Sequence, residues 1–113
     1  MVDDAYAIHQ IVTQYERGGA QSAVMQLEYR FHDVGIKTQS VAVYDKYPDQ
    51  ESDWRPHILS RRRPDPLRAT REIYRFLRRT RPADVTLAHT HYAIVLAGLA
   101  GLAARRPIVA VHH

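Results

Sequence analysis

Two patterns of hydrophobic and polar positions alternate along the chain. In one, short runs rich in β-branched and apolar residues are bounded by glycine, proline or charged residues, which is typical of strands. In the other, apolar residues recur at helical spacing, as Val24, Leu27 and Phe31 do, or fill a longer apolar segment. We expect strands at residues 7–15, 38–44, 85–88 and 107–111, and helices at residues 20–32, 66–80 and 91–104. This alternation predicts an α/β fold, a Rossmann-like parallel sheet with helices on both faces.

The ends of the predicted helices carry residues that start or stop a helix. Gly35 follows the first helix, at the position where glycine ends many helices. Pro64-Asp65-Pro66 marks the start of the second helix, because proline is tolerated in the first turn of a helix and aspartate caps the N-terminus. Pro82 follows the end of this helix. Residues 45–63 are polar, contain Trp54 and are predicted to be a connection. The predicted order is therefore β-α-β-loop-α-β-α-β.

Length, composition and charge narrow the classes of protein. The chain has 113 residues, so we treat residues 1–113 as one domain. Hydrophobic residues make up 45% and charged residues 25%, which excludes wholesale disorder. The absence of cysteine excludes disulfides, thiolate metal sites and a cysteine nucleophile, and fits a cytoplasmic compartment. The net charge of +4 favours anionic partners such as phosphates, nucleic acid or acidic lipid.

Residues 85–104 contain no aspartate, glutamate, lysine or arginine, which invites comparison with a membrane span. His89, Thr90 and His91 interrupt this stretch, and the apolar part that remains is shorter than the roughly 20 residues a spanning helix needs. The acidic, polar N-terminus lacks the features of a secretory signal. We therefore expect a buried helix here and no transmembrane segment.

Gly18 and Gly19 lie between the first predicted strand and the first predicted helix. Two glycines allow a sharp turn and a close approach of the backbone to a ligand. The start of the helix that follows offers free N–H groups and a positive dipole end to a phosphate. The alternative is an ordinary turn that needs glycine for its geometry alone, since a full GxGxxG fingerprint is absent. On the residues alone, both interpretations stay open.

Four histidines follow two of the predicted strands: His89 and His91 follow one, and His112 and His113 the other. In open α/β sheets the ligand binds beyond the carboxyl ends of the strands, near the switch in strand order. These histidines could bind or act on a substrate, hold a metal, or be polar surface residues. No acidic or cysteine ligand accompanies them at a recognisable spacing, so we expect no metal.

The second predicted helix carries an arginine face formed by Arg68, Arg71, Arg75, Arg78 and Arg79, with its apolar residues on the other side. Such a face could attract an anionic membrane surface or nucleic acid, or it could be a solvated outer surface partly balanced by glutamate. No aromatic RNA-binding pattern or helix-turn-helix signature is present, so we expect no nucleic-acid partner. If this face carries the function, the chain is a non-catalytic membrane-binding module.

Several other catalytic motifs are missing from the sequence. Without a Gly-x-Ser-x-Gly elbow, a Walker loop or His-Glu-x-x-His, the serine hydrolase, P-loop NTPase and zinc protease classes lack support. A nucleotide-binding oxidoreductase domain is a further alternative, weakened by the absent third glycine, although Asp45 lies near the usual ribose-binding acid. Asp65 and Asp84 are predicted to be isolated carboxylates, and Asp84 begins a strand, at the end of the sheet where catalysis is not expected.

Four segments, taken in order, resemble one known family. They are Gly18-Gly19-Ala20-Gln21, Gly35-Ile36-Lys37-Thr38, the stretch from Arg81-Pro82-Ala83-Asp84 to His89, and Pro107 to His112. Their order and spacing resemble the N-terminal domain of family-4-type glycosyltransferases with the GT-B fold. In that family a strand leads into GGAE or GGAQ, and two later strands each end in a histidine. The resemblance covers nearly the whole chain except residues 45–65.

The resemblance implies a retaining hexosyltransferase that moves a sugar from a nucleotide-diphosphate donor to an acceptor, with no metal and no other cofactor. By similarity, the backbone of Gly18 and Gly19 approaches the donor diphosphate. His112 matches the family histidine that faces the donor sugar and the reaction centre.

On the acceptor side, His89, Thr90 and His91 match the region of the family that shapes the acceptor site. Several members act on lipid acceptors at the inner face of a membrane, which would give the arginine face a use in peripheral membrane contact. The donor sugar and the acceptor do not follow from these residues.

The family's second, nucleotide-binding domain, with its basic pair and its E-x7-E motif, has no counterpart in these 113 residues. In the family its groups hold the nucleotide across a closed cleft, where preorganised charges stabilise the transition state. We therefore expect residues 1–113 to be half of an active site, as a fragment or as a subunit that needs a second chain, and to be inactive alone. A strand just before His112 would normally be followed by a covering element, which favours a fragment.

Overall fold

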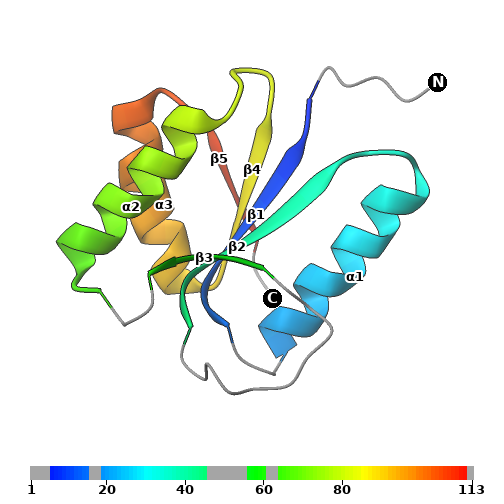
Figure 1. Ribbon diagram of the computed structural model, residues 1–113, viewed down its shortest axis with the longest axis horizontal. Coiled ribbons are helices and arrows are strands. Elements are labelled where there is room, and N and C mark those ends of the chain that lie inside the picture. Colours follow the sequence, from blue (N-terminus) through cyan, green and yellow to red (C-terminus); the bar gives the residue numbers. More distant parts are fainter. Residues whose placement is uncertain (1–5, 16–18, 46–55, 61–63, 112–113) are drawn as a thin grey trace.

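A computed structural model describes residues 6–15, 19–45, 56–60 and 64–111. In chain order these residues form β1 (Ile8–Tyr15), α1 (Gly19–Asp33), β2 (Thr38–Asp45), β3 (His57–Ser60), α2 (Pro66–Arg79), β4 (Val85–His89), α3 (His91–Ala104) and β5 (Ile108–Val111) (Figure 1). Every strand and helix predicted from the sequence is present, and each end lies within one residue of its prediction.

The described strands form one parallel sheet in the order β3-β2-β1-β4-β5. This order confirms the α/β, Rossmann-like fold. The chain places β2 and β3 on one side of β1 and then crosses over to add β4 and β5 on the other side. The switch in strand order therefore lies between β1 and β4, which is where open α/β sheets bind their ligands beyond the carboxyl ends of the strands.

Helices cover both faces of this sheet. α1 lies on one face, and α2 and α3 pack against each other on the opposite face (Figure 1). Successive side chains of β1 point to opposite faces, so that Ile11 joins the core beneath α2 and α3 and Val12 joins a smaller core beneath α1. Ile73 and Leu77 of α2 and Val24 of α1 are fully buried in these cores. β1 is thus enclosed by strands on both sides and by a helix layer on both faces.

β3 (His57–Ser60) corrects the prediction for residues 45–63, which were expected to be a connection without a strand. Ile58 packs against the core beneath α1, and Leu59 packs against the core on the other face. Two apolar residues in a polar stretch are too few to give a periodic signal. Pairing with β2 supplies the backbone hydrogen bonds and the burial that make this segment a strand. Trp54 lies outside the described residues.

None of the described helices combines the length and the apolar composition that crossing a membrane requires. α3, the most apolar of them, runs for 14 residues and buries Ala93, Leu96 and Ala97 against the sheet. Its outer side leaves Leu99 and Leu102 exposed. The interpretation of residues 85–104 as a strand followed by a buried helix is confirmed.

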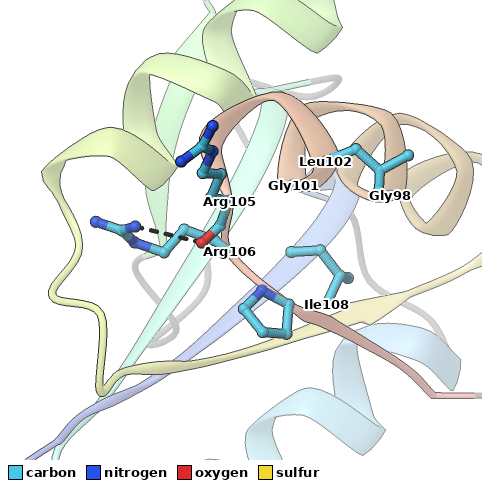
Figure 2. A pocket seen from close by; sticks show the side chains of 7 residues that line it. Gly98, Gly101, Leu102, Arg105, Arg106 and Ile108 are labelled. Atoms are coloured by element: carbon cyan, nitrogen blue, oxygen red, sulfur yellow. Dashed lines mark hydrogen bonds between the residues drawn. The ribbon is translucent and has the colours of Figure 1, made fainter.

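Gly101 allows the end of α3 to lie directly on the chain that enters β5 (Figure 2). A Cβ at this position would lie 2.6 Å from the carbonyl oxygen of Arg106 and 2.7 Å from Cγ1 of Ile108. The backbone turns back here, because Arg105 adopts the left-handed conformation (φ 57°) and the amide of Arg106 donates to the carbonyl of Gly101. Gly98, one turn earlier in the same helix, has no atom within 4 Å of a Cβ.

We expect Gly101→Ala to lower the free energy of unfolding by about 1–3 kcal/mol, because the added methyl group must displace a backbone carbonyl. Gly98→Ala is the matched control, with the same change in the same helix. It should raise stability by up to about 1 kcal/mol, since alanine favours a helix and has open space here. Urea denaturation of both variants measures the difference, and equal stabilities would contradict a close approach at Gly101.

Candidate functional site

The carboxyl ends of β1 and β4 meet at the switch point, with the starts of α1 and α3 beside them (Figure 1). Ile11 of β1 lies opposite Ala88 of β4, and α3 begins at His91, three residues beyond Ala88. α1 begins at Gly19 on one face of the sheet and α3 begins on the other face. Both helices direct the positive ends of their dipoles and their unpaired N–H groups toward this edge. The edge therefore favours an anionic or strongly polar ligand.

Thr90 joins β4 to α3 in a strained backbone conformation. Its φ is 71° and its ψ is 145°, a region that a β-branched residue rarely adopts and that costs about 1–3 kcal/mol. Its hydroxyl does not cap α3, because Oγ1 lies 2.8 Å from Oγ1 of Thr13 in β1. Strain of this kind is concentrated at ligand-binding positions. The N-terminus of α3 thus has no cap from Thr90, and its amides can interact with a ligand.

His89 and Gln10 form a buried chain of hydrogen bonds beneath this edge, and neither side chain is exposed. Nε2 of His89 lies 2.9 Å from Oε1 of Gln10, and Nε2 of Gln10 donates to the carbonyl of Val24 in α1 over 3.1 Å. Because the amide nitrogen of Gln10 faces a carbonyl, its oxygen faces His89, and Nε2 of His89 carries the proton in this bond. These two hydrogen bonds therefore connect β4 to β1 and β1 to α1 directly beneath the switch point.

The sequence prediction missed Gln10. A glutamine in the middle of an otherwise apolar strand is the signal that could have identified it, because a buried polar side chain needs a partner. The sequence does not reveal that this partner is His89, 79 residues further along the chain.

The predicted donor-side residues are described only in part. Gly19 is the first residue of α1 and follows the carboxyl end of β1, as predicted. Gly18 and His112 lie outside the described residues. Val111, the last residue of β5, lies opposite His89 of β4, so the described end of β5 reaches the same edge of the sheet.

The predicted acceptor-side residues occupy different depths of this edge. Thr90 lies at the junction of β4 and α3, and His91 is exposed at the first position of α3. His89 lies beneath them and is fully buried, and its role in acceptor binding stays a prediction. Among the residues that the structure describes, no three histidine, aspartate or glutamate side chains are grouped so that they could hold a metal ion.

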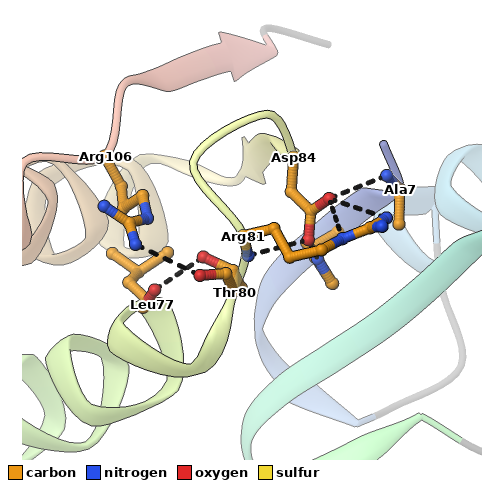
Figure 3. A network of polar contacts seen from close by, with 7 residues as sticks. Ala7, Leu77, Thr80, Arg81, Asp84 and Arg106 are labelled. Atoms are coloured by element: carbon orange, nitrogen blue, oxygen red, sulfur yellow. Dashed lines mark hydrogen bonds and ion pairs between the residues drawn. The ribbon is translucent and has the colours of Figure 1, made fainter. Parts of the chain in front are cut away.

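At the opposite, amino edge of the sheet, Asp84 is the centre of a polar network (Figure 3). The prediction that this carboxylate is isolated was wrong. Its Oδ2 lies 2.9 Å from Nε2 of His9 and accepts from the amide of Arg81 over 3.1 Å. Its Oδ1 accepts from the amide of Ala7 over 2.9 Å and from Nε of Arg81 over 3.2 Å. These bonds link the turn before β4 to the start of β1. The partners lie 75 and 77 residues apart in the sequence, so the sequence pattern does not predict their contact.

The network lowers the pKa of Asp84. Burial by itself would raise this pKa, but the hydrogen bonds from His9 and from the amides of Ala7 and Arg81, together with the charge of His9, outweigh burial and lower it from 3.8 to about 2. A carboxylate with a lower pKa in the folded state stabilises the fold above its unfolded pKa. This contribution of about 2 kcal/mol is lost as the pH falls from about 4 through about 2.

We expect Asp84→Asn to lower the free energy of unfolding by about 2 kcal/mol at pH 7, because the ionised acceptor is lost. The variant should also lose less stability than the parent between pH 4 and pH 2. Asp65→Asn is the control, since Asp65 is an exposed N-cap of α2 and asparagine caps equally well. Urea denaturation at pH 7, 4 and 2.5 measures all three proteins, and an unchanged acid dependence in Asp84→Asn would contradict this assignment.

A scan against protein-family models and a search of curated proteins found no significant match to this chain.

Proposed function

We propose that residues 1–113 are the acceptor-side, N-terminal part of a retaining glycosyltransferase that moves a sugar from a nucleotide-diphosphate donor to an acceptor. The observation that carries the proposal is the convergence of the starts of α1 and α3 at the switch point between β1 and β4. The reaction assigned to this edge comes from the resemblance of the four sequence segments to family-4-type glycosyltransferases. No metal or other cofactor is part of the proposal.

The donor diphosphate is assigned to the start of α1. Gly19 opens this helix, and the N–H groups and positive dipole of a helix start favour a phosphate by about 0.3–1 kcal/mol or more. Gly18 and Gly19 carry no side chain that would keep the diphosphate from the backbone. His112, the residue after β5 in the sequence, is assigned to the reaction centre, facing the donor sugar.

The acceptor is assigned to the start of α3. Thr90 is strained and leaves the first amides of α3 without its hydroxyl as a cap, and the exposed His91 lies next to them. His89 contributes from below, where its bond to Gln10 holds the end of β4 against β1. Rigid positioning of this kind is what a transfer reaction between two bound substrates requires.

Exposed apolar side chains beside β5 support the proposal that these residues are part of a larger protein. Leu99 and Leu102 of α3 are 56% and 81% exposed, and Val109 of β5 is 48% exposed. β5 is the edge strand of the described sheet, and in this fold a further parallel strand pairs with that edge while its helix covers the neighbouring helix. We assign this surface to a further segment of the same polypeptide, with the nucleotide-binding domain beyond it.

The proposal predicts that His112→Ala in the full-length protein lowers kcat by about 100-fold or more without changing the thermal midpoint, since groups at the reacting atoms contribute on this order. Gly19→Val should raise the KM for the donor. His32→Ala, an exposed residue in the last turn of α1, is the control and should behave as the parent. Release of nucleoside diphosphate from a panel of UDP-, GDP- and ADP-hexoses measures turnover. Robust turnover by residues 1–113 alone would contradict the proposal, as would a normal kcat in His112→Ala.

A second candidate function is docking to an anionic membrane through the arginine face of α2. Arg68, Arg71, Arg75 and Arg78 are all exposed, whereas the opposite side of the helix is buried in the core. The one ion pair described on this face joins Arg75 and Glu72 over 3.5 Å, and because the Arg75 side chain is half exposed, the pair neutralises little of the charge. This docking is compatible with a transferase that uses a lipid acceptor and also with a non-catalytic module.

For this second candidate we expect the triple variant Arg71→Gln, Arg75→Gln, Arg78→Gln to lower co-sedimentation with anionic vesicles by at least tenfold, because each basic residue near such a surface contributes about 1 kcal/mol. Arg30→Gln, on α1 and on the opposite face of the sheet, is the control. Vesicles of phosphatidylcholine with and without phosphatidylserine provide the comparison. Equal binding to both kinds of vesicle would rule out docking through this face.

A further inference from the structure

A cleft of about 460 Å³ lies at the amino edge of the sheet. The first residues of β1, β2 and β3 form one wall, and the end of α2 with the turn before β4 forms the other. Its charged and titratable lining comprises His9, Lys37, His57, Arg79, Arg81 and Asp84. The starts of α1 and α3 are at the opposite edge, so this cleft is separate from the proposed reaction site.

The charges that line the cleft are predominantly positive. Lys37, Arg79 and Arg81 are permanent cations, and Asp84 is the one carboxylate among the lining residues. Among the described residues, neither Lys37 nor Arg79 forms an ion pair, and the side chains of both are exposed to solvent. Lys37 and Arg79 at one cleft match a multiply charged anion, because the planar guanidinium binds phosphate through paired hydrogen bonds and lysine adds a compact charge.

Asp84 offsets the charge of Arg81, with which it forms an ion pair over 3.2 Å, but neither Asp84 nor the end of α2 cancels the charges of Lys37 and Arg79. Both oxygens of Asp84 already accept hydrogen bonds, from Ala7, Arg81 and His9. The negative dipole end of α2 amounts to about half a charge and is partly neutralised by hydrogen bonds. The hydroxyl of Thr80 donates to the carbonyl of Leu77, and Arg106 donates to the carbonyl of Thr80 (Figure 3). The cations therefore dominate the field in the cleft.

His9 also lines the cleft, and one of its ring nitrogens has no partner among the described residues. It is only 8% exposed, its Nε2 contacts Asp84, and its ring packs edge-on against Phe76 with centroids 5.4 Å apart. Its Nδ1 is buried and has no hydrogen-bond partner among the described residues. Such atoms are rare in folded proteins and carry a penalty that a bound ligand or water removes.

We infer that the amino-edge cleft binds a phosphate group, carried by a small soluble molecule or by a lipid headgroup, through Lys37 and Arg79. This site lies beyond the proposed transfer reaction and does not depend on it. It gives the protein a second anion site that uses side chains, whereas the carboxyl edge uses helix starts.

The test is an NMR titration of the full-length protein with glycerol 3-phosphate at low ionic strength. We expect saturable shifts at the amides of Ala7, Lys37 and Arg81, and a dissociation constant at least tenfold higher in Lys37→Gln with Arg79→Gln. Arg30→Gln with Arg105→Gln removes the same charge from exposed residues outside the cleft and should leave the affinity unchanged. All four positions are exposed, so the variants are expected to fold.

A parallel arm measures binding to phosphatidylcholine vesicles with and without phosphatidic acid. Binding of either probe that requires Lys37 and Arg79 supports the inference and identifies the source of the phosphate. Binding of neither probe, or an equal loss in the control pair, would overturn it. Gly19→Val distinguishes this site from the proposed donor site. If phosphate binding is lost in Gly19→Val but kept in the variant with Lys37→Gln and Arg79→Gln, the phosphate binds at the donor site and the inference is overturned.

Discussion

The parallel pairing of β1 with β4 is the interaction on which the rest of the structure depends. Side-chain bonds reinforce this pairing at three levels of the sheet. Asp84 bonds to His9 at the amino end, Gln10 bonds to His89 near the middle, and the hydroxyls of Thr13 and Thr90 meet at the carboxyl end. Two of these levels contain buried polar groups, which are costly to leave without partners. The register between β1 and β4 is therefore specified by polar contacts as well as by apolar packing.

This pairing creates two edges with different chemistry. At the carboxyl edge, backbone groups supply the attraction for anions, because two helices begin there. At the amino edge, α2 ends, and side-chain cations gather around a cleft. Backbone dipoles do not titrate and are held by the fold, whereas exposed lysine and arginine side chains are mobile and are screened by salt. The two proposed anion sites should therefore differ in their sensitivity to ionic strength.

The two helices on one face of the sheet show how much of the fold follows from sequence pattern. α2 has an apolar side that is buried and an arginine side that is exposed, as its periodicity predicts. α3 is apolar nearly all round, and its ends agree with the prediction, but its pattern could not show which side would be covered. β3 was missed because a four-residue edge strand with two apolar side chains has no periodicity that distinguishes it from a connection.

The sequence by itself determined the α/β class, the alternation of elements and the edge of the sheet at which the helices beginning at Gly19 and His91 start, because hydrophobic periodicity and the parallel arrangement of strands are local or topological properties. It did not determine that His89 would be buried against Gln10, or that Asp84 would meet His9 across 75 residues of chain. Hydrogen-bond partners of this kind are chosen by strand order and register. Those depend on how the helices pack on both faces, so only the tertiary structure decided them.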